Sequence, residues 1–82
     1  MGIFHKHDGR IAKAFEKVME LGKKETETEF LDSLNLITVA VQKDNSYTVN
    51  EKLKIYELLT MIANVAPAQR AKYANKLRRI LE

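Results

Sequence analysis

Apolar side chains recur every three or four residues along most of this chain, which is the spacing of an amphipathic helix. The first such pattern predicts a helix over residues 9–21. Its expected buried face carries Ile11, Phe15 and Val18. Gly22 is expected to end this helix, because glycine adopts the left-handed conformation of a helix C-cap without strain.

A second helix is expected to begin at Thr26, because a threonine three residues before a glutamate, here Glu29, is the pattern of a capping box. Apolar residues then surround the helix axis, at Phe30, Leu31, Leu34, Leu36, Ile37, Val39, Ala40 and Val41. Apolar positions on all sides are typical of a helix that is buried on all sides. The sequence therefore predicts that this helix is central in the fold.

The same segment leaves an alternative secondary structure. Ile37, Thr38, Val39 and Val41 are β-branched, and Ile37, Val39 and Val41 occupy alternate positions, a pattern that favours a strand. Such a strand would pair with residues 47–49 across a turn and give an α+β fold with a hairpin at about residues 36–49. The helix is the favoured interpretation, because the apolar run continues the helical phase set by Phe30 and Leu34.

Two further helices follow the second one. Thr48 and Glu51 form another capping box, and the apolar stripe after it consists of Ile55, Leu58, Leu59, Ile62 and Val65. Pro67 suits the first position of the last helix, whose expected buried residues are Tyr73, Leu77, Ile80 and Leu81. Four helices with short joints predict an all-α fold, a compact four-helix bundle. It would be a single helical domain over residues 1–82, with residues 1–8 as a flexible leader.

Composition narrows the classes of function. With 82 residues, 45% of them hydrophobic and 30% charged, the chain is expected to fold around one small core. A core of this size makes self-association into a homo-oligomer a further expectation. The absence of cysteine excludes disulfides, thiolate zinc sites and thiol catalysis. No apolar run has the length of a membrane span, so we expect a cytoplasmic protein without membrane insertion.

The net charge of +3 is unevenly distributed along the chain. Residues 1–24 hold six basic and three acidic groups, residues 25–51 one basic and six acidic, and residues 52–82 seven basic and two acidic. Ion pairs between neighbouring helices explain part of such a pattern. A basic end is also a candidate surface for an acidic partner.

The last helix carries the strongest candidate surface of that kind. Its basic residues are Arg70, Lys72, Lys76, Arg78 and Arg79, a set that could contact phosphates or a protein partner. Tyr73 is the only aromatic residue among them, and its phase places it against the core, which counts against base stacking. A solvated helix face explains the same residues. The alternative function is therefore a small basic regulator of phage or mobile-element type that binds nucleic acid through this helix.

Residues that could hold a metal ion occur near the N-terminus. His5, His7 and Asp8 place two imidazoles and a carboxylate close together in sequence, as in transition-metal sites. A leader offers such ligands little support, so no native metal site and no cofactor are expected there. No nucleophile stands beside a base in a recognisable pattern, so the chain is not expected to be an enzyme.

The segment between the second and third helices resembles the second half of an EF-hand loop. Glu51 would close the loop as the bidentate ligand and Asp44 would be a middle ligand. Ala40 and Gln42 stand at the earlier ligand positions, and an alanine side chain cannot coordinate calcium. Calcium binding by this loop is therefore not expected.

This segment also resembles the repeat joint of the TerB-like helical domains of tellurite resistance, over roughly residues 36–62. Asp44, Tyr47, Thr48 and Glu51 match the acidic turn, the hydrophobic residue, the cap and the helix-opening glutamate of that family. Asn45 stands in place of the family's glycine. The resemblance implies an accessory role in metal-responsive stress complexes or membrane-proximal assemblies. A capped turn between two helices explains the same residues. The expected function is a non-catalytic protein–protein interaction or accessory module.

Overall fold

A computed structural model of the chain describes residue 7 and residues 9–82. This part of the chain forms α1 (Arg10–Gly22), α2 (Glu27–Lys43), α3 (Val49–Asn64), the short 3-10 helix η1 (Pro67–Gln69) and α4 (Arg70–Leu81), and it contains no strand. The prediction of an all-α fold is confirmed. The alternative hairpin is wrong, because Ile37 and Val41 continue the buried stripe that begins at Phe30 and Leu34 in one helix.

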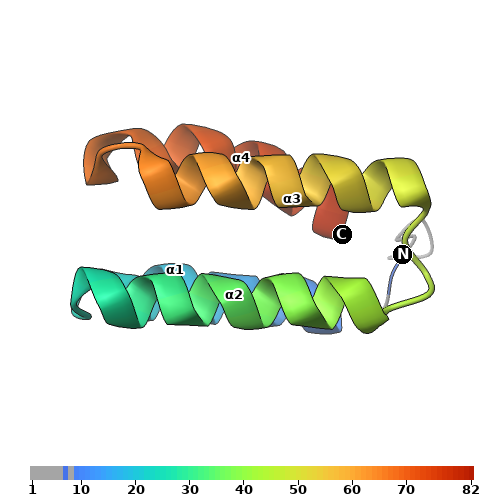
Figure 1. The fold of residues 1–82 in the computed structure, drawn as a ribbon, viewed down its shortest axis with the longest axis horizontal. Coiled ribbons are helices and arrows are strands. Elements are labelled where there is room, and N and C mark those ends of the chain that lie inside the picture. The colour runs from blue at the N-terminus through green and yellow to red at the C-terminus, as the bar shows by residue number, and fades with distance from the viewer. Residues whose placement is uncertain (1–6, 8) are drawn as a thin grey trace.

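Successive helices run antiparallel to one another (Figure 1). α1 packs closely against α2, and α3 against α4, while α2 and α3 join the two pairs. α1 and α4 make fewer contacts with each other. The joint between α2 and α3, the last turn of α4 and the first turn of α1 lie at the same end of the bundle (Figure 1).

One stripe of each α-helix contributes to a common core. The core residues are Ile11, Phe15, Phe30, Leu34, Ile37, Val41, Tyr47, Ile55, Leu58, Leu59, Ile62, Ala74, Leu77 and Leu81. These positions follow the helical spacing along each element, so burial of amphipathic faces accounts for the assembly. Among the described residues, Tyr47 is the one core residue that comes from a loop and not from a helix.

Both expected capping boxes are present. Thr26 Oγ1 accepts the backbone N–H of Glu29 at 3.2 Å, and Glu29 Oε1 accepts that of Thr26 at 2.9 Å. At the start of α3 the corresponding distances between Thr48 and Glu51 are 3.1 and 2.9 Å. Each box satisfies two backbone donors that the first turn of a helix leaves without intrahelical partners.

Gly22 ends α1 for a reason that differs from the expected one. Among the described glycines only Gly9, which precedes α1, has a positive φ, of 83°. Gly22 is instead needed for close approach, because a Cβ added there would lie 2.5 Å from Cδ1 of Phe30. Phe30 is 2% exposed, so its ring would have to shift to admit a side chain at position 22. The left-handed cap predicted at Gly22 is therefore wrong.

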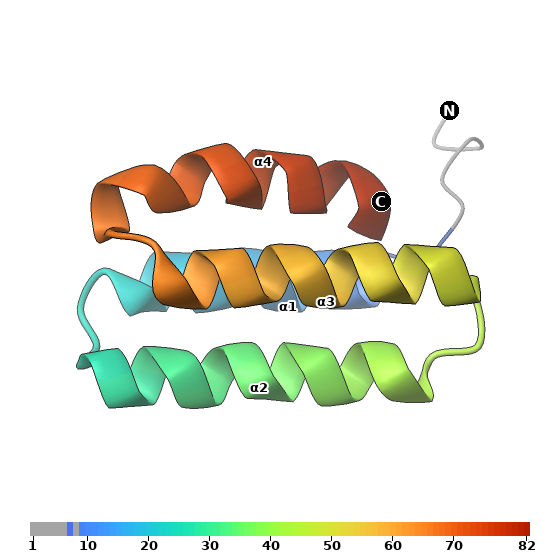
Figure 2. The same ribbon diagram turned by 45° about the horizontal axis from the view of Figure 1, so that its top comes forward.

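The position of α2 also differs from the expectation. It lies at an edge of the bundle, with α1 and α3 beside it (Figure 2). Within the described part of the chain, Leu36 remains 70% exposed and Val39 42% exposed. The prediction of a central, mostly buried helix is wrong because one stripe of α2 suffices to cover the core. The apolar residues outside that stripe face outward.

Candidate functional site

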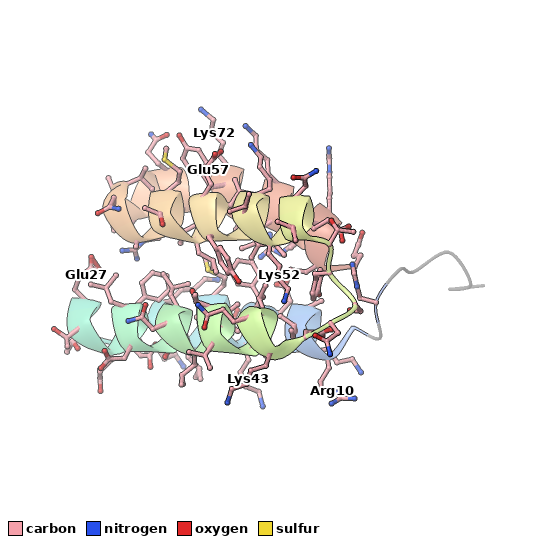
Figure 3. All side chains as sticks on the ribbon, turned by 45° about the vertical axis from the view of Figure 1, so that its right-hand side comes forward. Arg10, Glu27, Lys43, Lys52, Glu57 and Lys72 are labelled. Carbon is pink, nitrogen blue, oxygen red and sulfur yellow. The ribbon has the colours of Figure 1, made fainter. Side chains whose placement is uncertain are left out.

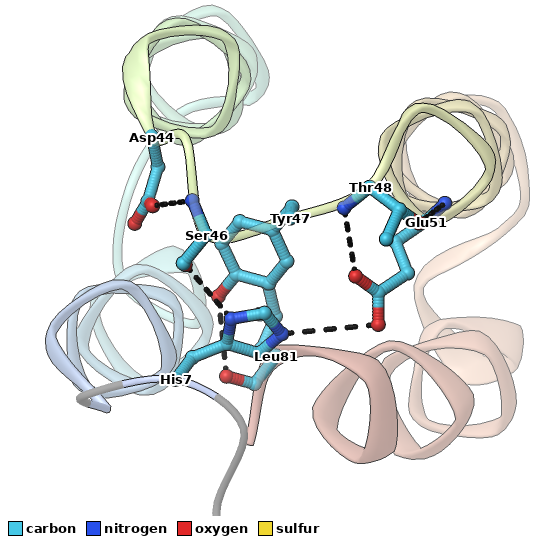
Figure 4. Close-up of polar contacts among 7 residues, drawn as sticks. All are labelled: His7, Asp44, Ser46, Tyr47, Thr48, Glu51 and Leu81. Carbon is cyan, nitrogen blue, oxygen red and sulfur yellow. Dashed lines mark hydrogen bonds and ion pairs between the residues drawn. The ribbon is translucent and has the colours of Figure 1, made fainter.

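The joint between α2 and α3 holds the two carboxylates that resemble calcium ligands. Asp44 Oδ1 accepts the backbone N–H of Ser46 at 2.8 Å (Figure 4). Hydrogen bonding from the hydroxyl and then from the backbone N–H of Ser46 lowers the pKa of Asp44 below its usual value. Glu51 caps the backbone of Thr48. Both carboxylates therefore have structural roles in closing the turn and starting α3.

His7 packs into this joint from the N-terminal side. Its side chain is 2% exposed and stacks on the ring of Tyr47, with 3.7 Å between the ring centroids. Nδ1 lies 2.8 Å from Oγ of Ser46, and Nε2 lies 3.8 Å from Oε2 of Glu51 (Figure 4). Of the expected flexible leader, residues 1–8, the structure describes only this residue. At His7 the chain is packed against the bundle, which the sequence did not indicate.

Tyr47 connects the joint to the far end of the chain. Its hydroxyl donates a hydrogen bond to the backbone carbonyl of Leu81, 3.2 Å away in the last turn of α4. Its ring carries the stacked imidazole of His7 on one face. The α2–α3 joint, the N-terminal side of α1 and the C-terminal end of α4 thus meet at one side chain (Figure 4).

The titratable side chains of the joint contact protein groups in this geometry. Within residue 7 and residues 9–82, no group of three or more His, Cys, Asp or Glu side chains is placed to hold one. The candidate ligands His5 and Asp8 lie outside the described residues. His7, Asp44 and Glu51 gather at the joint, but they bind protein groups there.

The five basic residues predicted on α4 divide into two groups. Arg70 donates two hydrogen bonds to the carboxylate of Glu27 on α2, at 2.8 and 3.2 Å, and its guanidinium lies 4.2 Å from the ring centroid of Phe30. Arg78 pairs with Glu16 on α1. These two arginines link α4 to the pair formed by α1 and α2, so their charges are largely neutralised within the protein.

The other group forms an open basic strip, which consists of Lys72, Lys76 and Arg79. All three are exposed, and none has an ion-pair partner in the described part of the chain. Figure 3 shows Lys72 pointing away from the α1 and α2 layer. The Nζ atoms of Lys72 and Lys76 lie 5.4 and 5.9 Å from the ring centroid of Tyr73, which is half-buried beside them.

A neutral groove between α2 and α3 is a feature that the sequence reasoning missed. It has a volume of about 440 Å³ and is lined by Leu31, Leu34, Asn35, Thr38, Tyr56, Leu59, Thr60, Ala63 and Asn64. Val49 and Leu53 continue the α3 wall of this groove by helical spacing and are 74% and 60% exposed. Both residues lie outside the buried stripe of α3. Apolar residues outside such a stripe can be recognised in the sequence as candidates for an exposed apolar surface.

No helix in the described part of the chain is long and apolar enough to cross a membrane. The fold and its surfaces define a small antiparallel four-helix protein with one neutral groove and one basic strip. Comparison of the chain with protein-family models, curated proteins and solved structures finds no match. The resemblance to TerB-like domains therefore stays a prediction from residues 36–62.

Proposed function

We propose that this protein is a non-catalytic interaction module that binds a helical segment of a partner protein in the neutral groove between α2 and α3. The observation that carries the proposal is the exposure of Val49 and Leu53, which continue the α3 side of this groove by helical spacing without being among its lining residues. The stripe that packs α3 into the bundle already consists of other residues, so these two side chains contribute little to the protein's own core. Burial against a partner would contribute about 1.5–3 kcal/mol for each.

The lining of the groove supports a helical partner segment. None of its lining residues is charged, although 30% of the chain is. Its walls are two antiparallel helices, and a third helix packs readily into the groove that such a pair forms. Tyr56, Thr60 and Asn64 supply polar groups at its edge that can fix the register of a bound helix.

An accessory role within a larger assembly agrees with this binding mode. The resemblance of the α2–α3 joint to TerB-like domains supports a role in stress-related complexes, and the expected site of action is the cytoplasm. In this proposal the joint does not bind the partner. Tyr47 instead anchors the joint to α4, and Lys52 Nζ of α3 donates a hydrogen bond to the backbone carbonyl of Gln42 in α2, so that the groove is preformed.

Photo-crosslinking in the native host tests the proposal. A crosslinking residue at position 56, in the groove, is expected to give one defined protein adduct that disappears when Leu53→Lys is added. The matched control places the crosslinker at position 75, an exposed site on α4. Equal adducts at both positions, or an adduct that survives Leu53→Lys, would contradict binding in the groove.

A second candidate function is nucleic-acid binding through the basic strip of α4. It is favoured by one observation, which is that Lys72, Lys76 and Arg79 share an open face without acidic partners in the described chain. Retention on a nucleic-acid column should then fall steeply with salt, because phosphate contacts release counterions. Lys72→Glu with Lys76→Glu should abolish retention. Absence of retention by the unmodified protein at low salt would exclude this function.

A further inference from the structure

The outer face of α2 carries a second heptad stripe. Its members are Asp32, Leu36, Val39 and Lys43, separated by four, three and four residues. The buried stripe of the same helix, from Phe30 to Val41, has the same spacing. The two stripes lie on different faces, since Leu36 and Val39 are exposed while the residues of the buried stripe are not. A 3.5-residue apolar period is the signature of a helix that packs against another helix.

The outer stripe is self-complementary in an antiparallel pair. A two-fold axis that crosses between residues 37 and 38 places Leu36 opposite Val39 of a second copy. The same axis places Asp32 opposite Lys43 of the second copy. One register therefore joins both apolar residues and both opposite charges at once. In antiparallel coiled coils the two kinds of heptad core position face each other in this way.

The charges at the ends of the stripe are available for such a contact. Neither Asp32 nor Lys43 has an ion-pair partner within the described part of the chain. Figure 3 shows Lys43 at the joint end of α2, with its side chain pointing away from α3. In the antiparallel orientation, Asp32 of each copy therefore faces Lys43 of the other copy.

We propose that two copies of this protein associate through the outer stripe of α2, antiparallel, with Leu36 against Val39 at the centre and Asp32 against Lys43 at both ends. This interface covers the apolar residues of α2 that the monomer leaves exposed. It also accounts for the presence of apolar side chains around the whole circumference of the helix. The surface is separate from the groove between α2 and α3, so the proposal does not depend on the function of that groove.

The size of the contact sets its expected strength. One pair of 17-residue helices buries less surface than the 1,200–2,000 Å² or so typical of stable complexes. The dimer should therefore dissociate in the micromolar range or above, and be in exchange with the monomer. Sedimentation velocity of the full chain from about 10 μM to about 1 mM covers this range.

The wild-type protein should shift from monomer to dimer across that series. Leu36→Lys should weaken the association by at least about tenfold, because it places a lysine at the apolar centre. Asp32→Lys alone and Lys43→Asp alone should each weaken it, since each places like charges opposite each other. The double variant Asp32→Lys with Lys43→Asp should restore the association, because it exchanges the two ends of the same pairs.

Leu53→Lys is the matched control, since it introduces the same charge at an exposed apolar residue outside the proposed interface. It should leave the association unchanged, while it tests the groove independently. Far-UV circular dichroism should show the same helical content for all variants, because the substituted side chains are exposed. A wild-type monomer at every concentration would overturn the proposal. So would loss of the dimer on Leu53→Lys, or failure of the double charge exchange to restore it.

Discussion

The hydroxyl of Tyr47 donates a buried hydrogen bond to the backbone carbonyl of Leu81, 34 residues further along the chain. The carbonyls in the last turn of a helix have no intrahelical donor, so this bond satisfies a group that α4 leaves without an intrahelical partner. It also joins a loop to the end of the chain. A residue that sequence patterning treats as part of a turn is thus one of the core contacts that close the bundle.

Removal of this hydroxyl should destabilise the protein measurably. Tyr47→Phe keeps the ring that stacks on His7 and leaves the Leu81 carbonyl without its donor. The expected loss is about 1–3 kcal/mol in the free energy of unfolding, measured by urea denaturation. Tyr73→Phe is the control, because the half-buried Tyr73 has no hydrogen-bond partner for its hydroxyl in the described part of the chain, and this variant should lose no more than about 0.5 kcal/mol. Equal losses for both variants would contradict the role of the Tyr47 bond.

The cap at the start of α3 gives a second prediction. Thr48→Ala removes the oxygen that accepts the N–H of Glu51 and should cost about 1 kcal/mol of stability. Thr48→Ser keeps this oxygen and should cost much less. Thermal unfolding followed by circular dichroism measures both variants. An alanine variant as stable as the serine variant would show that the cap contributes nothing.

Asp44 should make stability depend on acid pH. Because Ser46 lowers the pKa of Asp44 in the folded protein, the folded state binds its proton less readily than the unfolded state does. The contribution of Asp44 to the free energy of unfolding is complete above the unfolded-state pKa of about 3.9. It is lost as the pH falls through the lower folded-state pKa. Urea midpoints measured between about pH 2 and pH 6 should show this loss, and Asp44→Asn should reduce it. An unchanged acid dependence in Asp44→Asn would exclude this residue as a source.

Gly22→Ala should destabilise the protein although alanine favours helices. The added Cβ would lie 2.5 Å from Cδ1 of Phe30, so the buried ring would have to shift from its place in the core. The expected net loss is about 1–3 kcal/mol in the free energy of unfolding by urea. In a protein that already carries Phe30→Leu, Gly22→Ala should cost less stability, because Phe30→Leu removes the ring atoms near position 22. Purely additive effects of the two changes would show that they do not touch.

Arg70 and Arg79 should respond differently to the same substitution. Arg70→Ala removes the ion pair with Glu27 and the packing over Phe30, and should cost about 1–2 kcal/mol. Arg79→Ala removes an exposed side chain and should change stability by less than about 0.5 kcal/mol. Thermal unfolding distinguishes the two variants. A comparable loss for Arg79→Ala would mean that the basic strip is also structural.

Local signals in the sequence were sufficient for the elements of this fold. Thr26 and Thr48 mark two helix starts correctly, because a capping box needs only residues within one turn. The helical phase through Phe30 and Leu34 likewise decided between helix and hairpin in α2. The conformation of Gly22 was predicted wrongly, because a close approach to a ring on another helix leaves no local mark.

The candidate sites were predictable only in part. Sequence identified five basic residues on α4, but it could not separate Arg70 and Arg78 from the open strip, since their acidic partners belong to other helices. Burial of His7 depends on a stacking contact with Tyr47, 40 residues away. Leu36 and Val39 of α2 were predicted to be buried, although the structure leaves both exposed. Whether such a residue is covered depends on which helix lies beside it.

The sequence by itself determined the helices and the two capping boxes that begin α2 and α3, because these follow from periodicity and from hydrogen bonds within one turn. Only the tertiary structure decided which groups meet across helices. It pairs two arginines of α4 with acidic residues of the other layer, places His7 against Tyr47, and leaves the outer stripe of α2 uncovered. The physical reason is that one chain of this length can cover only one face of each helix.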